Sequence, residues 1–166
     1  IPAILTSSKM LTTGVDANLL KTFAAIESSF NPRAGAGTST AKGLFQFIND
    51  TWTGMLDKYG KKYGLSPSTS VYDPRANALM GAEFLKENQK GLKSINRGNS
   101  PVELYLAHFL GLGGARRLFS APEGDPANLH VDEKSIRANY DVFYKNGKIR
   151  TVRDIIAWAA NLVKTK

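Results

Sequence analysis

Segments of helical length in which apolar residues return every three or four positions account for most of this 166-residue chain. In residues 16–30, Leu20, Phe23, Ala24 and Phe30 share one helical face. Periodic segments of the same kind follow over residues 50–59, 73–89, 100–110 and 151–164. The pattern therefore predicts a mainly α chain with little or no β structure.

Start signals for helices precede four of these segments and support their boundaries. They are Asp16, Asp73 before Pro74, Ser100 with Glu103, and Thr151 with Asp154. Glycines at 111–114 predict a break after the fourth segment, and shorter helices are expected up to Phe119 and after Asp132. The Asn-Gly pair at 146–147 predicts a small hairpin.

The length of the chain suits one hydrophobic core, so we expect a single domain over residues 1–166. No apolar run approaches the roughly 18 residues of a membrane span, and no signal peptide is visible. We therefore expect no stable membrane insertion. Since residue 1 is Ile rather than Met, a module removed before it stays an open alternative.

The net charge of +8 predicts a polyanionic partner or surface. The cations are scattered along the chain, and neither a phosphate-binding glycine loop nor an RNA-binding aromatic motif is present. We therefore expect no nucleic acid partner, and an anionic cell envelope fits the charge. Cysteine is absent and the two histidines lack metal-ligand spacing, so we expect no metal and no cofactor.

One acid, Glu27, lies on the apolar face of the first periodic segment, with Ile26 beside it. An apolar environment raises the pKa of a carboxyl group, so this side chain can hold a proton at neutral pH. The alternative is a frayed last turn that leaves Glu27 in solvent. A protonated carboxyl beside the glycine-rich loop at 35–43 is what a sugar-cleaving enzyme needs to protonate a glycosidic oxygen.

The segment "IESSFNPRAGAGTSTAKGLFQF", residues 26–47, resembles the first motif of the soluble lytic transglycosylase family, which is similar in fold to goose-type lysozyme. Further resemblance lies in "DPRANALMG", residues 73–81, and "LYLAHFLG", residues 104–111. The matching residues of the first motif are Glu27, Ser28, Ala41, Gly43, Leu44 and Gln46. The resemblance, which spans most of residues 14–160, implies a single lysozyme-like helical domain.

The chain departs from the family pattern after Ala107, where His108 and Phe109 replace the usual Tyr-Asn pair. The "AHFLG" form, with "YDVFYKNGKIRTV" downstream, resembles the branch found in bacteriophage endolysins and virion-associated lysins. His108 is left with two interpretations, which are a core histidine hydrogen-bonded within its helix and a substrate contact.

The resemblance implies cleavage of the β-1,4 bond between N-acetylmuramic acid and N-acetylglucosamine in peptidoglycan. Glu27 would donate its proton to the leaving oxygen and then accept one from the muramic C6 hydroxyl, which attacks C1 and forms a 1,6-anhydro end. By the same resemblance Ser28 would steady Glu27, and Gln46 would hold an N-acetyl or hydroxyl group. Tyr59 would line the sugar groove, and Tyr105 would approach the scissile bond. The alternatives for the serine and the tyrosines are backbone bonding and aromatic packing.

Two other functions remain open at this point. One is a hydrolytic muramidase of the same fold, and the other is a non-catalytic peptidoglycan-binding or virion structural protein. For the enzyme, we expect a monomer that binds peptidoglycan glycan strands and an anionic envelope surface. It would be phage-encoded and act in the bacterial periplasm or cell wall, and removal of a wall-binding module before residue 1 stays an open alternative.

Overall fold

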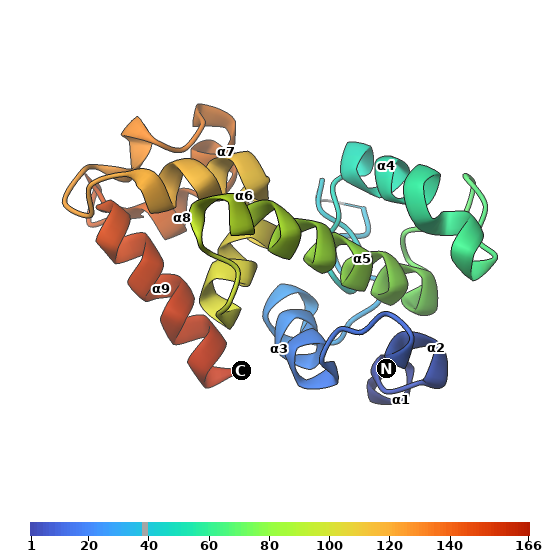
Figure 1. The fold of residues 1–166 in the computed structure, drawn as a ribbon. Coiled ribbons are helices and arrows are strands. Elements are labelled where there is room, and N and C mark those ends of the chain that lie inside the picture. Colours follow the sequence, from blue (N-terminus) through green and yellow to red (C-terminus); the bar gives the residue numbers. More distant parts are fainter. Residues whose placement is uncertain (38–39) are drawn as a thin grey trace. The chain divides into compact units, whose positions relative to one another are not determined.

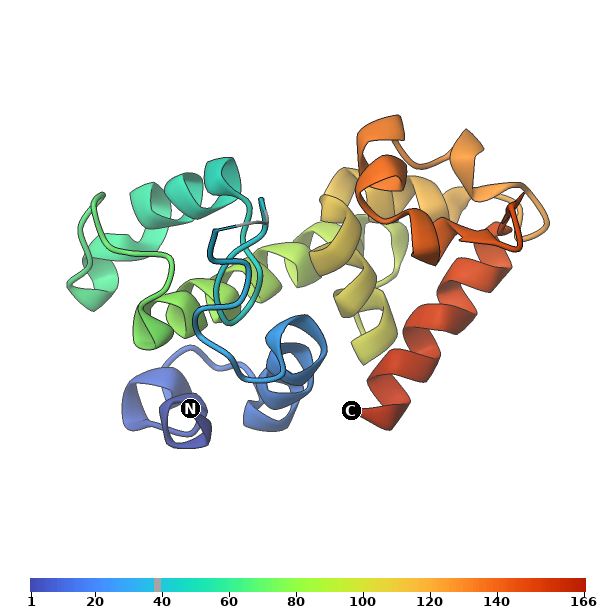
Figure 2. The same ribbon diagram turned by 180° about the vertical axis from the view of Figure 1, so that it is seen from behind.

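The computed structural model describes residues 1–37 and 40–166, and most of these residues are helical (Figures 1 and 2). The prediction of a mainly α chain with little β structure is confirmed. Two compact units can be distinguished, residues 1–87 with Lys166 and residues 88–165. The expectation of one domain over residues 1–166 stays a prediction.

Among the described residues, the first unit contains four α-helices, one 3-10 helix and the first part of a fifth α-helix. They are α1 (Pro2–Leu5), α2 (Ser8–Leu11), α3 (Ala17–Ser28), α4 (Asn49–Tyr59) with the 3-10 helix η1 (Gly60–Tyr63), and α5 (Pro74–Leu92), which continues into the second unit. The short helices α1 and α2 were not predicted, because four residues are too few to show a helical period.

The predicted starts of α3 and α5 are confirmed by their caps. Asp16 accepts a hydrogen bond from the Leu19 amide at 3.2 Å, and Asp73 accepts one from the Ala76 amide at 2.9 Å. Helix α3 ends at Ser28, slightly before the predicted stop, because the next two residues take left-handed φ angles of 51° and 63°. The chain therefore turns before it reaches Pro32.

The second unit contains the rest of α5, two long helices and several shorter elements. They are η2 (Lys93–Ile95), α6 (Pro101–Ser120), η3 (Ala127–Leu129), α7 (Glu133–Ala138), α8 (Tyr140–Phe143), strands β1 (Tyr144–Lys145) and β2 (Lys148–Ile149), and α9 (Val152–Thr165). The predicted break is present in α6 at Gly111, whose φ and ψ are 79° and 160°. Helices α6 and α9 pack against each other.

The start of α6 differs in one detail from the predicted capping box. Ser100 accepts from the Glu103 amide at 3.3 Å as expected. The carboxylate of Glu103, however, accepts from the Gly98 and Asn99 amides at 3.0 and 3.2 Å, which lie before the cap. Arg97 also donates to this carboxylate at 3.0 Å, so the acid fastens the whole turn that enters the helix.

The hairpin and the last helix begin as predicted. Strands β1 and β2 pair antiparallel, and Asn146 and Gly147 between them both take positive φ angles of 53° and 75°. This is the backbone of the type I′ turn that an Asn-Gly pair favours. Thr151 and Asp154 then cap α9 reciprocally through bonds of 3.1 and 3.2 Å.

Two tyrosine–glutamate pairs join α4 and η1 to α5 in the first unit. The Tyr59 hydroxyl donates to Glu87 at 2.6 Å, and the Tyr63 hydroxyl donates to Glu83 at 2.6 Å. The bond to Glu87, together with burial and the charges of Glu87 and Glu83, raises the pKa of Tyr59 to about 12. Burial raises the pKa of Glu83, but bonds from Tyr63 and Lys62 and the charges of nearby lysines outweigh it and hold that pKa below its usual value.

Replacing Tyr63 by Phe should lower the free energy of unfolding by about 1.5–3 kcal/mol at pH 7, because the buried Glu83 carboxylate loses a donor. A carboxylate with a lowered pKa stabilises the fold fully above the ordinary value of about 4.3, and this contribution disappears as the pH falls through the lower folded value. The difference in the free energy of unfolding between the variant and the wild type should therefore become smaller below about pH 4. Urea titrations at several pH values measure it.

The control for this experiment is Tyr72→Phe, because the Tyr72 hydroxyl makes no hydrogen bond that the structure shows within the described residues. It should leave the unfolding free energy unchanged. A Tyr63→Phe variant as stable as the wild type at pH 7 would contradict the assigned role of this pair.

Among the helices of the described residues, none combines the length and the apolar character that crossing a membrane would need.

Candidate active site

Glu27 lies on the last turn of α3, and its side chain is half-buried. On the same helix Leu20 and Phe23 are fully buried. The turn that carries Glu27 is closed by backbone bonds from the Ser29 amide to the Ala25 carbonyl at 3.1 Å and from the Phe30 amide to the Ala24 carbonyl at 3.4 Å. The alternative of a frayed last turn with a fully exposed acid is therefore wrong.

After α3, the chain forms a tight turn over residues 42–47. Lys42 and Phe47 exchange two backbone hydrogen bonds of 2.9 Å, and the four residues between them form the turn. Gly43 and Gln46 both take positive φ angles, 81° and 55°. The two residues between these, Leu44 and Phe45, are buried, so the turn is anchored in the core of the first unit.

Ser28 connects the last turn of α3 to this loop. Its hydroxyl bonds to the Leu44 carbonyl at 2.8 Å and to the Ala24 carbonyl at 3.1 Å. A serine hydroxyl has one proton, which here lies between two carbonyl oxygens. Ser28 therefore ties the last turn of α3 to the loop through backbone carbonyls, and its role toward Glu27 stays a prediction.

Gln46 is held by the same loop. Its Nε2 donates to the Ala34 carbonyl at 3.3 Å and to the Gly43 carbonyl at 3.1 Å. Because both acceptors are carbonyls, the amide has only one acceptable orientation, with Nε2 toward the loop. The side-chain oxygen is then the atom that can serve a ligand, and it can only accept a hydrogen bond.

Asn77 on α5 fixes the loop from the other side. Its side chain is fully buried, accepts from the Phe45 amide at 2.8 Å and donates to the Val71 carbonyl at 2.8 Å. A Cβ added at Gly43 would lie 2.3 Å from the Asn77 Nδ2 atom, so only glycine fits there. Sequence reasoning quoted this segment but did not assign Asn77 a role.

The "DPRANALMG" segment has a spacing that brings three of its residues onto the same face of α5. Asp73, Asn77 and Gly81 follow one another at four-residue intervals and lie on one face of α5. The first caps the helix, the second bonds the loop, and at the third a Cβ would lie 2.8 Å from the Phe45 ring. This interval was the signal that could have revealed a loop-binding face.

The remaining predicted residues are distributed between the two units. Tyr59 belongs to the first unit, with Glu27, Ser28 and Gln46, and its hydroxyl is bonded to Glu87. Tyr105 belongs to the second unit, where the residue is buried, with 2% of its surface exposed. The ring lies 6.1 Å from that of Phe109 and 6.2 Å from that of Trp158, in agreement with the packing alternative for the ring.

His108 also lies in the second unit, on α6, and is half-buried. The two interpretations of its role stay predictions. Over residues 1–37 and 40–166, no group of three or more His, Cys, Asp or Glu side chains is arranged to hold a metal ion.

Comparison with known proteins gives a consistent result. The family described as "Transglycosylase SLT domain" matches residues 5–123. The chain is 29% identical over 118 residues to "Membrane-bound lytic murein transglycosylase C" of Photorhabdus laumondii, covering 70% of this chain and 33% of the relative. It is 28% identical over 116 residues to "Membrane-bound lytic murein transglycosylase E" of Buchnera aphidicola, covering 69% of this chain and 52% of the relative. The chain thus spans a third to a half of these relatives.

Proposed function

Because the chain belongs to the Transglycosylase SLT domain family, whose fold is helical and lysozyme-like, we propose that it cleaves the β-1,4 bond between N-acetylmuramic acid and N-acetylglucosamine in peptidoglycan. The observation that supports this most is the placement of Glu27. The acid is half-buried on a closed helical turn, and Ser28 ties that turn to the loop carrying Gln46. A carboxyl group held in this way is positioned rather than mobile, as acid catalysis requires.

The reaction we propose uses the Glu27 carboxyl twice. It first gives its proton to the glycosidic oxygen as the bond from that oxygen to C1 of the muramic residue breaks. The C6 hydroxyl oxygen of the same sugar then bonds to C1, and its proton passes to the Glu27 carboxylate. The proton is thus returned, no water is consumed, and the products are a 1,6-anhydro end and a free N-acetylglucosamine hydroxyl.

The other predicted residues receive supporting roles in this proposal. The oxygen of Gln46 would accept a hydrogen bond from an N-acetyl N–H or a hydroxyl, because its Nε2 is already used by the loop. Tyr59 would offer its ring to the sugar groove, since its hydroxyl is bonded to Glu87. We also propose that Tyr105 and His108 contact the glycan.

The site of action that we propose is the cell wall in the bacterial periplasm. Two relatives are named membrane-bound lytic murein transglycosylases, and murein is the wall polymer. The net charge of +8 would concentrate the protein at an anionic envelope and make its action sensitive to salt. A phage origin, action as a monomer and the absence of a nucleic acid partner are parts of the same proposal.

Mass spectrometry of digested sacculi tests the proposal. We expect new glycan ends that are lighter than reducing ends by the mass of one water molecule and that borohydride does not reduce. Ends that are reducible and carry the added water would assign the chain to the hydrolytic muramidases. Sacculi that stay intact would favour the non-catalytic wall-binding alternative.

A further inference from the structure

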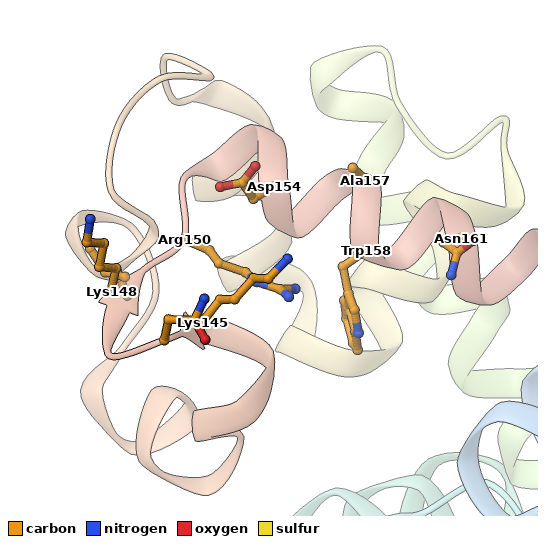
Figure 3. Close-up of a pocket in the computed structure, with 9 residues that line it drawn as sticks. Lys145, Lys148, Arg150, Asp154, Ala157, Trp158 and Asn161 are labelled. Carbon is orange, nitrogen blue, oxygen red and sulfur yellow. The ribbon is translucent and has the colours of Figure 1, made fainter.

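A pocket in the second unit is lined by residues that the proposed reaction does not use. It has a volume of about 680 Å³ and lies between the β1–β2 hairpin and α9 (Figure 3). Figure 3 shows Arg150 reaching from the hairpin side toward Trp158 on α9, while Lys148 points away. The nine lining residues are Lys145, Asn146, Lys148, Ile149, Arg150, Asp154, Ala157, Trp158 and Asn161.

The charge of this pocket is positive. It has three basic side chains and one acid, Asp154, whose carboxylate already accepts from the Thr151 amide at 3.1 Å. In the part of the chain that the structure describes, none of the three cations forms an ion pair with a carboxylate. Hydrogen bonds from Thr151, and then the charge of Arg150, hold the pKa of Asp154 below its usual value, so the half-buried Arg150 lies near this carboxylate without forming an ion pair with it.

The pocket is held in shape by the backbone around it. The Arg150 amide donates to the Phe143 carbonyl at 2.7 Å, and the Arg150 carbonyl accepts from the Ala127 amide at 2.9 Å. Trp158 packs on Phe109 with ring centroids 5.1 Å apart. The backbone that carries Arg150 and the aromatic wall are therefore held in place before any ligand arrives, which lowers the entropy cost of binding.

The polar groups indicate what kind of anion fits. A guanidinium and an ammonium bind carboxylate or phosphate oxygens. The side chains of Asn146 and Asn161, however, each offer a carbonyl acceptor beside their donors. A phosphate ester polymer has few donors to satisfy these acceptors, whereas a peptide has both carboxylates and amide N–H groups, and Trp158 can cover its short apolar side chains.

We propose that this pocket binds the carboxylate-bearing peptide stem of peptidoglycan, with Arg150 and Lys145 on the carboxylates, the two asparagines on peptide groups and Trp158 against an alanine side chain. The proposal rests on the function proposed above for the source of the peptide. The pocket would give the proposed enzyme a second binding site, which recognises the peptide part of the polymer rather than the glycan part.

The test uses the full chain and a synthetic stem tetrapeptide with free carboxylates, followed by NMR titration of the Trp158 indole N–H signal, which Trp52→Phe identifies. We expect saturable shifts of this signal, binding that weakens as salt is added, and an affinity at least about tenfold lower in the Lys145→Gln, Arg150→Gln double variant. The matched control is Lys134→Gln with Lys164→Gln, two exposed lysines of the same unit outside the pocket, which should bind as the wild type does.

Three outcomes would overturn the inference. A tetrapeptide whose carboxylates are converted to carboxamides could bind equally well, inorganic phosphate could displace the tetrapeptide at equal concentration, or the control variant could lose as much affinity as the pocket variant. The wild-type protein is assayed in parallel on stem-free glycan strands. Cleavage of these strands without tetrapeptide binding would contradict only the proposal for the pocket. Tetrapeptide binding without cleavage of any glycan would contradict only the proposed reaction.

Discussion

Glu27→Gln is expected to fold as the wild type does and to lose at least about 10²-fold in the rate of sacculus lysis, because acid–base catalysis contributes about that factor or more. The amide keeps the size and most of the hydrogen-bonding capacity of the carboxyl, but it can neither release a proton to the leaving oxygen nor take one from the C6 hydroxyl. Turbidity of a sacculus suspension measures the rate, and thermal unfolding checks the fold.

The matched control for this variant is Asp57→Asn, which makes the same chemical change at an exposed acid on α4. It should lyse sacculi at the wild-type rate. Tyr105→Phe should reduce the rate far less than Glu27→Gln does, since it removes only a hydroxyl. A Glu27→Gln variant with more than about a tenth of native activity would refute the assignment, as the acid would then contribute less than general acid catalysis does.

Asn77→Asp is expected to lower the free energy of unfolding by about 2–4 kcal/mol at pH 7, since it spoils one buried hydrogen bond and buries a charge. One oxygen can still accept from the Phe45 amide, but the other faces the Val71 carbonyl, at the site where Nδ2 donated at 2.8 Å. The loop beside Glu27 should loosen, so lysis should slow as well.

Acid provides a specific check on this explanation. A protonated aspartic acid at position 77 can accept from the Phe45 amide and donate its hydroxyl to the Val71 carbonyl, which restores both bonds. The stability gap from the wild type should therefore shrink between pH 7 and pH 4 in urea titrations. Asn49→Asp, at the exposed start of α4, should be neutral or slightly stabilising. A gap for Asn77→Asp that does not change with pH would contradict the two-bond account.

The local features of the fold could be predicted from the sequence because short-range chemistry decides them. The Asp16 cap, the Thr151–Asp154 pair and the Asn146–Gly147 turn each involve residues at most a few positions apart. Glu27 could be singled out for a similar reason, since an acid within an apolar stripe is visible in the periodicity itself.

The hydrogen bond by which Asn77 holds the turn at residues 42–47 could not be predicted in the same way. Asn77 and Phe45 are 32 positions apart, and only folding brings the amide of one to the side chain of the other. The cationic pocket was missed for the same reason, because Arg150 and Trp158 come from different elements. The Tyr105 ring packs in the second unit, as one of its two interpretations predicted, and its contact with the substrate stays a prediction.

The most direct test of the central claim, that one carboxyl on α3 acts on a peptidoglycan glycosidic bond, is a crystal structure of the Glu27→Gln variant with a peptidoglycan tetrasaccharide. The claim predicts that the side chain at position 27 lies within about 3.2 Å of the glycosidic oxygen between N-acetylmuramic acid and N-acetylglucosamine, the reach of a general acid. A tetrasaccharide that binds elsewhere, with no glycosidic oxygen near position 27, would contradict it.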